Sequence, residues 1–304
     1  HFAWLLFSRY TLYTKTKLGY MFYKRQVKKA REHHPTGHSV TQPTVLNGVK
    51  IIPISVIEDN YSYLIIDTTS DTAVAVDPSD PQVVQGLKKK KKKLLFVKLR
   101  SLKERDHSGG NKTLKKLYKK CRVYGSSTDN IPGLTEPAYV VVVVVVGSLA
   151  LKKVAGALLT QGQSTHIIKG ITYPGRAWQY MIEESSVNLL LSSLLSNLSL
   201  CFCSPHHPGH EYAQDNLKFA AEIEPNNTEC EAKFQWVMTQ RQGKLCTCPS
   251  TIGEEKSYNP FLRTHLQELH EALGLQHTPD DDFTRFRAQV LEEVRKRKDL
   301  FKAR

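Results

Sequence analysis

The chain contains few cysteines, six in 304 residues. That number is too small for a disulfide scaffold, because domains stabilised by disulfides are short and rich in cysteine. Two pairs, Cys201 with Cys203 and Cys246 with Cys248, have a single residue between their members, whereas zinc knuckles place about two to four residues there. We therefore expect reduced thiols in an intracellular protein.

Long apolar segments are also scarce. The apolar stretch over residues 1–7 is far shorter than the roughly 20 residues that span a bilayer. Tyrosines, phenylalanine and basic residues follow it, a pattern typical of the cytoplasmic end of a truncated membrane anchor. A disordered leader is the alternative. We interpret residues 1–46 as a basic, aromatic segment with a linker, and expect a membrane-associated or mitochondrial protein.

Acidic residues are outnumbered, with 29 Asp and Glu against 43 Lys and Arg, and the formal net charge is +14. Six consecutive lysines at residues 88–93, and many basic residues between Arg9 and Arg31, contribute to this excess. Contact with nucleic acid or an anionic membrane is one interpretation. Because no aromatic residue is interleaved with the lysines to stack on bases, we expect a solvated basic surface and no nucleic-acid partner. A nucleic-acid binder would lose its binding sharply with added salt.

Turn residues divide the first part of the chain into short runs. Strands are expected at residues 50–56, 61–67, 73–76, 94–99 and 122–125, and helices from Pro81 and over 111–120. Strand–helix alternation after several antiparallel strands predicts a mixed α/β sandwich over residues 47–210. Seven consecutive valines, residues 140–146, suit a strand that is buried on both faces.

The pattern becomes helical from Glu211 onward. Helices are expected at residues 212–223, 227–240, 259–272 and 282–301. The last one begins after three aspartates and ends with Lys and Arg, as the helix dipole favours. Residues 211–304 are therefore expected to form a C-terminal helical subdomain.

Two short motifs contain candidate metal ligands. The segment DHSGGN, residues 106–111, lies between an expected strand and an expected helix, and PGHEY, residues 208–212, contains a further histidine. A loop at the carboxyl end of a strand can direct imidazole and carboxylate groups toward a metal ion, and these donors suit zinc or iron. Taken alone, the first motif is more typical of a turn with a helix cap than of a metal site.

Further segments join these motifs in one pattern: DNYSY (59–63), AVDP (75–78), NLKFA (216–220), EPN (224–226), CPST (248–251) and YNPFLR (258–263). Together they resemble the glyoxalase II (hydroxyacylglutathione hydrolase) branch of the metallo-β-lactamase superfamily. The resemblance implies an α/β fold, the αβ/βα four-layer sandwich of that superfamily, with a C-terminal helical subdomain. It also implies two zinc or iron ions and a small-molecule substrate, a glutathione thioester such as S-lactoylglutathione.

The resemblance assigns roles to five residues of this chain. Asp106, His107 and His210 match metal ligands, and Asp106 is also the catalytic carboxylate that orients the attacking water. Arg295 and Lys298, in the last expected helix, match basic residues that bind the carboxylates of glutathione.

The sequence departs from the family pattern at the other ligand positions. The first two histidines of the family's Thr-His-x-His-x-Asp-His motif fall on Leu102 and Glu104, and a later ligand falls on Gln163. No aspartate occurs between Asp129 and Asp215, so the bridging aspartate is absent. Because two divalent ions need several imidazole or anionic donors, the pattern predicts an impaired hydrolase. The alternative is a non-catalytic binding or regulatory relative that keeps the fold.

Two further interpretations concern residues near the second motif and the choice of family branch. His206 and His207 could replace missing ligands, but they precede a proline turn and are expected to be surface histidines. An iron-dependent persulfide dioxygenase would share the fold, and the matching C-terminal segments favour the hydrolase over it.

Overall fold

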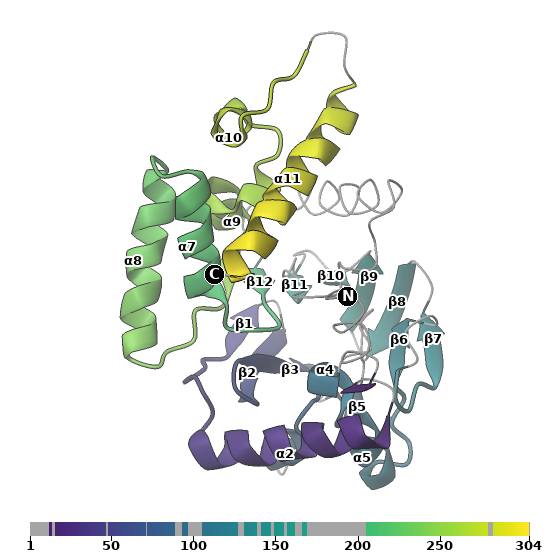
Figure 1. The fold of residues 1–304 in the computed structure, drawn as a ribbon. Helices are drawn as coiled ribbons and strands as arrows, with labels where there is room; N and C mark the ends of the chain where they lie inside the picture. Colours follow the sequence, from purple (N-terminus) through teal and green to yellow (C-terminus); the bar gives the residue numbers. More distant parts are fainter. Residues whose placement is uncertain are drawn as a thin grey trace. The chain divides into compact units, whose positions relative to one another are not determined.

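The computed structural model describes residues 12–13, 16–46, 48–70, 72–88, 93–96, 105–126, 131–138, 141–146, 149–154, 157–161, 166–168, 205–278 and 282–303. These residues form a mixed α/β protein (Figure 1), which confirms the expected class. The chain divides into two compact units. The first unit comprises His1–Ser164, Gly209–Glu211 and Lys244–Cys246, and the second comprises Thr165–Pro208, Tyr212–Gly243 and Thr247–Arg304.

A five-stranded sheet organises the first unit. Its strands follow chain order: β1 (Thr44–Leu46), β2 (Val49–Val56), β3 (Asn60–Asp67), β4 (Thr72–Val76) and β5 (Lys93–Phe96). Neighbours are antiparallel except β4 and β5, which run parallel. Every residue of β3 is buried, as expected for a central strand with both faces covered. The strands predicted at 50–56, 61–67 and 73–76 are confirmed.

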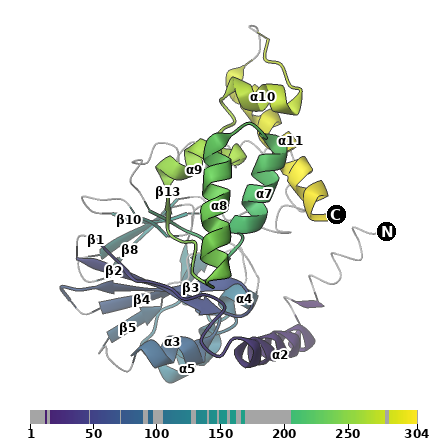
Figure 2. The same ribbon diagram turned by 90° about the vertical axis from the view of Figure 1, so that its left-hand side faces the viewer.

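Helices cover one face of this sheet, where Figure 2 shows α2 (Lys17–His33), α3 (Pro81–Lys88) and α5 (Asn111–Leu117). Val84 of α3 and Leu114 of α5 are 1% exposed and pack against the apolar side chains of β2, β3 and β4. α3 connects the parallel strands β4 and β5, as parallel pairing requires a crossover. The short helix α4 (Arg105–Ser108) precedes α5.

Part of the N-terminal segment is an ordered element of the first unit rather than a disordered leader. Thr16 caps α2 by accepting a hydrogen bond from the Gly19 amide at 3.1 Å. Tyr23 is buried and its hydroxyl donates to the carbonyl of Ser79, and Arg31 forms a bidentate ion pair with buried Asp80. Within the described part of the chain, no helix is both long enough and apolar enough to cross a membrane. Membrane association and mitochondrial localisation stay predictions.

The remaining described strands of the first unit are β6 (Tyr124–Ser126) and β7 (Glu136–Ala138), which are parallel, and β8 (Val141–Val146), β9 (Leu149–Val154) and β10 (Ala157–Gln161), which are antiparallel. The valine run therefore forms a strand, as predicted. β8 lies against β4 of the five-stranded sheet.

The second unit is mainly helical. It contains strands β11 (His166–Ile168), β12 (Pro205–His207) and β13 (Ser250–Thr251), and helices α7 (Ala213–Ile223), α8 (Thr228–Gln242), α9 (Ile252–Tyr258), η2 (Pro260–Leu262), α10 (Gln267–Leu273) and α11 (Phe283–Ala303). α7 and α8 lie side by side in Figures 1 and 2. α11 buries Val290, Leu291 and Val294 completely against Phe219 and Leu269. The C-terminal helical region is confirmed.

The helix predicted over residues 259–272 is confirmed only in its last part, which α10 covers, and a helix before it was not predicted. α9 begins at a capping box, in which Thr251 accepts from the Glu254 amide and Glu254 accepts from the Thr251 amide. It ends before Pro260, which has no amide hydrogen to donate to a continuing helix. The chain makes one 3-10 turn there and starts α10 only at Gln267.

The lowered pKa of Glu255 in α9 makes the stability of the protein depend on pH. Burial acts to raise the pKa of Glu255, but the hydrogen bond and charge of His206 and the hydrogen bonds from Ser250 and Asn259 outweigh it and lower the pKa to about 2. Because the folded-state pKa lies below the unfolded value, the stabilisation is complete above about pH 4.5 and is lost as pH falls toward about 2. We expect Glu255→Gln to lower the free energy of unfolding at pH 7 by about 1–3 kcal/mol.

The measurement is urea unfolding at pH 7 and pH 3. The loss caused by Glu255→Gln should shrink at the lower pH, and Glu292→Gln, at an exposed position of α11, should change stability little at either pH. An equal loss for Glu255→Gln at both values would contradict the assignment.

Candidate metal centre

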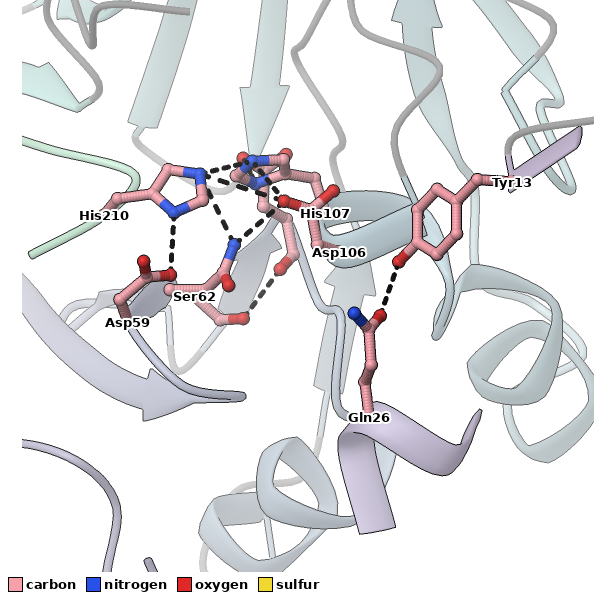
Figure 3. A network of polar contacts seen from close by, with 9 residues as sticks. Tyr13, Gln26, Asp59, Ser62, Asp106, His107 and His210 are labelled. Carbon is pink, nitrogen blue, oxygen red and sulfur yellow. Dashed lines mark hydrogen bonds and ion pairs between the residues drawn. The ribbon is translucent and has the colours of Figure 1, made fainter. Parts of the chain in front are cut away.

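Three of the predicted site residues lie together in the first unit. Asp106 and His107 belong to α4, and His210 lies 103 residues later in the chain. Figure 3 shows these side chains converging. His107 Nε2 lies 3.0 Å from His210 Nε2 and 3.5 Å from Asp106 Oδ2, and His210 Nε2 lies 3.9 Å from the same carboxylate oxygen. Within the described ranges, these residues are the group of three whose donor atoms could hold a metal ion.

Backbone hydrogen bonds to the start of β3 position His210. The Tyr61 amide donates to the Gly209 carbonyl at 2.9 Å, and the Glu211 amide donates to the Asp59 carbonyl at 2.7 Å. The Tyr61 hydroxyl also donates to the Glu211 carboxylate at 2.5 Å. The PGHEY segment is thus paired with the strand on both sides of His210, which directs the imidazole toward α4.

A close backbone approach positions the other motif. Gly110 lies against the turn that follows β4, and a Cβ atom there would come within 2.0 Å of the Pro78 carbonyl oxygen. The Gly110 backbone is in the right-handed helical region, so the space, and not the dihedral angles, requires glycine. This approach brings α4 beside Asp77.

Two carboxylates that the resemblance did not assign hold the imidazole rings. His107 is fully buried, and its Nδ1 lies 3.1 Å from Asp77 Oδ2; His210 Nδ1 lies 3.1 Å from Asp59 Oδ1 (Figure 3). A carboxylate at Nδ1 fixes the tautomer that leaves Nε2 as the ligand atom. Asn60 adds a hydrogen bond from its side-chain amide to Asp106 Oδ2 at 3.2 Å. Asp59 and Asn60 belong to the DNYSY segment and Asp77 to the AVDP segment. Their place in these family-like segments was the only indication of them in the sequence.

The donor set fits one divalent ion. Ligand atoms of tetrahedral zinc, at about 2.0–2.1 Å from the metal, lie roughly 3.3–3.4 Å from one another. The distances of 3.0, 3.5 and 3.9 Å between the three donors bracket that value. Two imidazoles and one carboxylate leave a fourth position open, as catalytic zinc sites do. Leu102, Glu104 and Gln163, which occupy the other ligand positions, lie outside the described residues.

The predicted glutathione-binding residues lie on α11 and make contacts inside the second unit. The ammonium of Lys298 donates to the Asp215 carbonyl at 3.1 Å and lies 4.6 Å from the centre of the Phe219 ring. Lys298 is 1% exposed, and burial lowers its pKa to about 7. Arg295 forms a bidentate pair with Asp299, at 2.6 and 3.0 Å.

The prediction that His206 and His207 are surface histidines is wrong. His207 is fully buried, and the His206 side chain is only 12% exposed. Both belong to β12, which pairs with β11 on one side and β13 on the other. They therefore lie in an interior strand of the sheet and not in a surface turn. His206 Nδ1 lies 3.2 Å from the Ser250 hydroxyl and 3.6 Å from Glu255 Oε1, a contact that stabilises the second unit.

The chain is similar to known proteins in sequence and in fold. The family model "Hydroxyacylglutathione hydrolase C-terminus" matches residues 211–301. The cytoplasmic hydroxyacylglutathione hydrolase of Arabidopsis thaliana is 31% identical over 272 residues, which is 84% of this chain and 100% of that protein. A metallo-β-lactamase structure from Staphylococcus aureus subsp. aureus COL has a TM-score of 0.46 at 16% identity, covering 75% of this chain and 67% of that chain. The DIM-1 metallo-β-lactamase structure has a TM-score of 0.40 at 13% identity, covering 56% of this chain and 89% of that chain.

Proposed function

This chain belongs to the hydroxyacylglutathione hydrolase family, the glyoxalase II branch of the metallo-β-lactamase superfamily, and we propose that it hydrolyses glutathione thioesters at Asp106, His107 and His210. The observation that carries the proposal is the convergence of two imidazole nitrogens and one carboxylate oxygen within 4.8 Å. A thioester hydrolase of this family needs such a cluster to hold a catalytic metal.

The reaction adds water across the thioester. The oxygen of water bonds to the carbonyl carbon, the carbon–sulfur bond breaks, and the products are a carboxylic acid and glutathione, whose sulfur takes up the proton. A divalent ion held at this site would supply Lewis acidity, polarising the carbonyl and making water a stronger nucleophile near neutral pH. His107 and His210 would hold it through Nε2, and the carboxylate of Asp106 would both bind the ion and orient the water.

The substrate's glutathione moiety carries two carboxylates, and we assign their binding to Arg295 and Lys298. The Arg295 guanidinium suits a carboxylate because its planar fork matches two oxygens, and its present partner Asp299 is 54% exposed, so a substrate carboxylate can displace it. Lys298 must exchange its hydrogen bond with the Asp215 carbonyl for one with the substrate, which makes Arg295 the better supported of the two.

Hydrolysis of S-lactoylglutathione by the zinc-loaded protein tests this function. We expect release of free thiol, and a loss of rate of at least about 100-fold in His107→Ala and His210→Ala, because metal binding contributes several kcal/mol to such reactions. Glu58→Ala is the matched control, since Glu58 is 50% exposed and its carboxylate contacts His34 instead of the cluster. Absence of turnover in the zinc-loaded wild type would contradict the proposal.

The second candidate is a non-catalytic relative that binds glutathione or its thioester. The residues at the other ligand positions, Leu102, Glu104 and Gln163, favour it. Isothermal titration calorimetry with S-lactoylglutathione separates the two candidates. If the compound binds and is recovered intact from the sample, the protein has the regulatory role. If lactate is found in the sample, the protein is a hydrolase.

A further inference from the structure

We propose that this chain binds a single divalent ion, instead of the pair implied by its family, and that Asp59 and Asp77 set the affinity of that site. The inference deepens the proposed function and rests on its assignment of the metal centre to Asp106, His107 and His210. It assigns positioning roles to two carboxylates that neither motif contains.

The orientation of the two imidazoles is the first argument. Because Nδ1 of each ring is directed at a carboxylate, the hydrogen of each ring is favoured at Nδ1, which makes both Nε2 atoms acceptors although they lie 3.0 Å apart. The Asn60 side-chain amide also lies 3.4 Å from His210 Nε2. Two facing lone pairs repel, whereas a cation beside both of them is attracted to both. The arrangement is therefore that of a cation site of two imidazoles, which Asp106 completes with its negative charge.

The supporting carboxylates come from two separate turns of the first unit. Asp77 follows β4, is 2% exposed and has a backbone φ of 46°, a value that residues other than glycine rarely adopt. From this buried and sterically restricted position, its side chain is directed at His107. Asp59 ends the turn before β3, and its carbonyl also accepts the hydrogen bond from Glu211. Each carboxylate contacts one ring on the side away from Asp106, where it fixes the ring and raises the basicity of Nε2.

The sequence gives the argument for one ion. A second ion in this family uses histidines at the positions of Leu102 and Glu104, and the residues beside Glu104 are Lys103 and Arg105. Leu102 cannot bind a metal, and the cationic side chains of Lys103 and Arg105 on either side of Glu104 disfavour a second 2+ charge there. Gln163, an amide, replaces a third imidazole. The three donors that remain are the ones that converge in the structure.

Counting zinc in the full-length protein tests the stoichiometry. The protein is stripped with a chelator, reloaded with excess zinc and passed over a desalting column, and zinc and protein are then quantified in the same fractions. We expect one equivalent of zinc per chain, and less than half an equivalent in His210→Ala. Two equivalents, or none, would overturn the proposal.

Zinc affinity, measured by competition with a chromophoric chelator, tests the two carboxylates. We expect Asp59→Ala and Asp77→Asn to weaken binding by about 10- to 100-fold, with saturation still at one equivalent. Glu58→Ala, the neighbouring half-exposed carboxylate in the same turn, should change affinity less than twofold. Because Asp77 is buried, circular dichroism establishes that its variant is folded, and Asp59→Ala tests the same idea at a more exposed position. Unchanged affinity in both variants would contradict the positioning roles.

The outcomes separate this inference from the proposed function. One equivalent of zinc without turnover of S-lactoylglutathione refutes the hydrolase and leaves the single-ion site standing. Two equivalents with turnover refutes the single-ion site and leaves the hydrolase standing.

Discussion

Alanine in place of Gly110 is expected to destabilise the first unit by more than about 4 kcal/mol, an effect that is exceptional for a single substitution. The added Cβ would lie 2.0 Å from the Pro78 carbonyl oxygen and 3.0 Å from that of Ser79. Both contacts are with backbone, so no side-chain rotation can relieve them, and the turn after β4 must move away from α4. That movement would also separate Asp77 from His107, so zinc binding should be lost together with stability.

Gly86→Ala is the matched control for this prediction. Gly86 lies within α3, and a Cβ there meets nothing within 4 Å. Alanine is favoured over glycine in a helix interior by about 0.5–1 kcal/mol, so this variant should be slightly stabilised. Chemical unfolding, followed by circular dichroism, measures both. A Gly110→Ala variant within about 1 kcal/mol of the wild type would contradict the close approach on which the geometry of the centre depends.

Arg263→Ala is expected to destabilise the second unit by about 3–5 kcal/mol, because it breaks a buried ion pair and leaves one charge uncompensated. The guanidinium donates to both carboxylate oxygens of Glu224, at 2.9 to 3.2 Å, and to the Ser257 carbonyl at 3.0 Å. The side chains of Arg263 and Glu224 are 14% and 7% exposed. The pair joins the end of α7 to the residues that follow α9.

The control for Arg263 removes the same charge from an exposed pair in the same unit. Lys296 lies 3.8 Å from Glu293 with 71% of its side chain exposed, and such pairs contribute about 0–1 kcal/mol. Lys296→Ala should therefore shift the unfolding midpoint little. Equal losses for the two variants would show that the buried pair contributes no more than a surface one.

Much of the first unit was predictable because residues typical of turns separate its strands. The expected metallo-β-lactamase type of fold with a helical C-terminal region is confirmed. The helices predicted at 212–223, 227–240 and 282–301 are confirmed as α7, α8 and α11, whereas the region between α8 and α11 was predicted less well. The sequence contains the residues of the capping box, Thr251 and Glu254, but the helix that begins there was not predicted and is only seven residues long. Residues 259–272 were predicted as one helix, yet Pro260 has no amide hydrogen to donate, and α10 begins only at Gln267.

Of the candidate metal centre, only the three proposed ligands were predicted from the sequence, and only through the resemblance. Asp106, His107 and His210 stand in recognisable motifs, whereas Asp59 and Asp77 act through contacts that arise when β3, β4 and α4 pack together. No spacing rule relates an aspartate to an imidazole 30 or more residues away. His206 and His207 were misplaced for the same reason, since the partners of β12 come from distant parts of the sequence.

X-ray absorption at the zinc edge of the reconstituted protein tests the central claim most directly, because it reports the atoms around the metal. The account predicts imidazole scattering from two histidines, nitrogen and oxygen neighbours at about 2.0–2.1 Å, and no metal neighbour at about 3.5–4 Å. Zinc surrounded by oxygen alone, without imidazole scattering, would contradict the assignment of His107 and His210 as ligands.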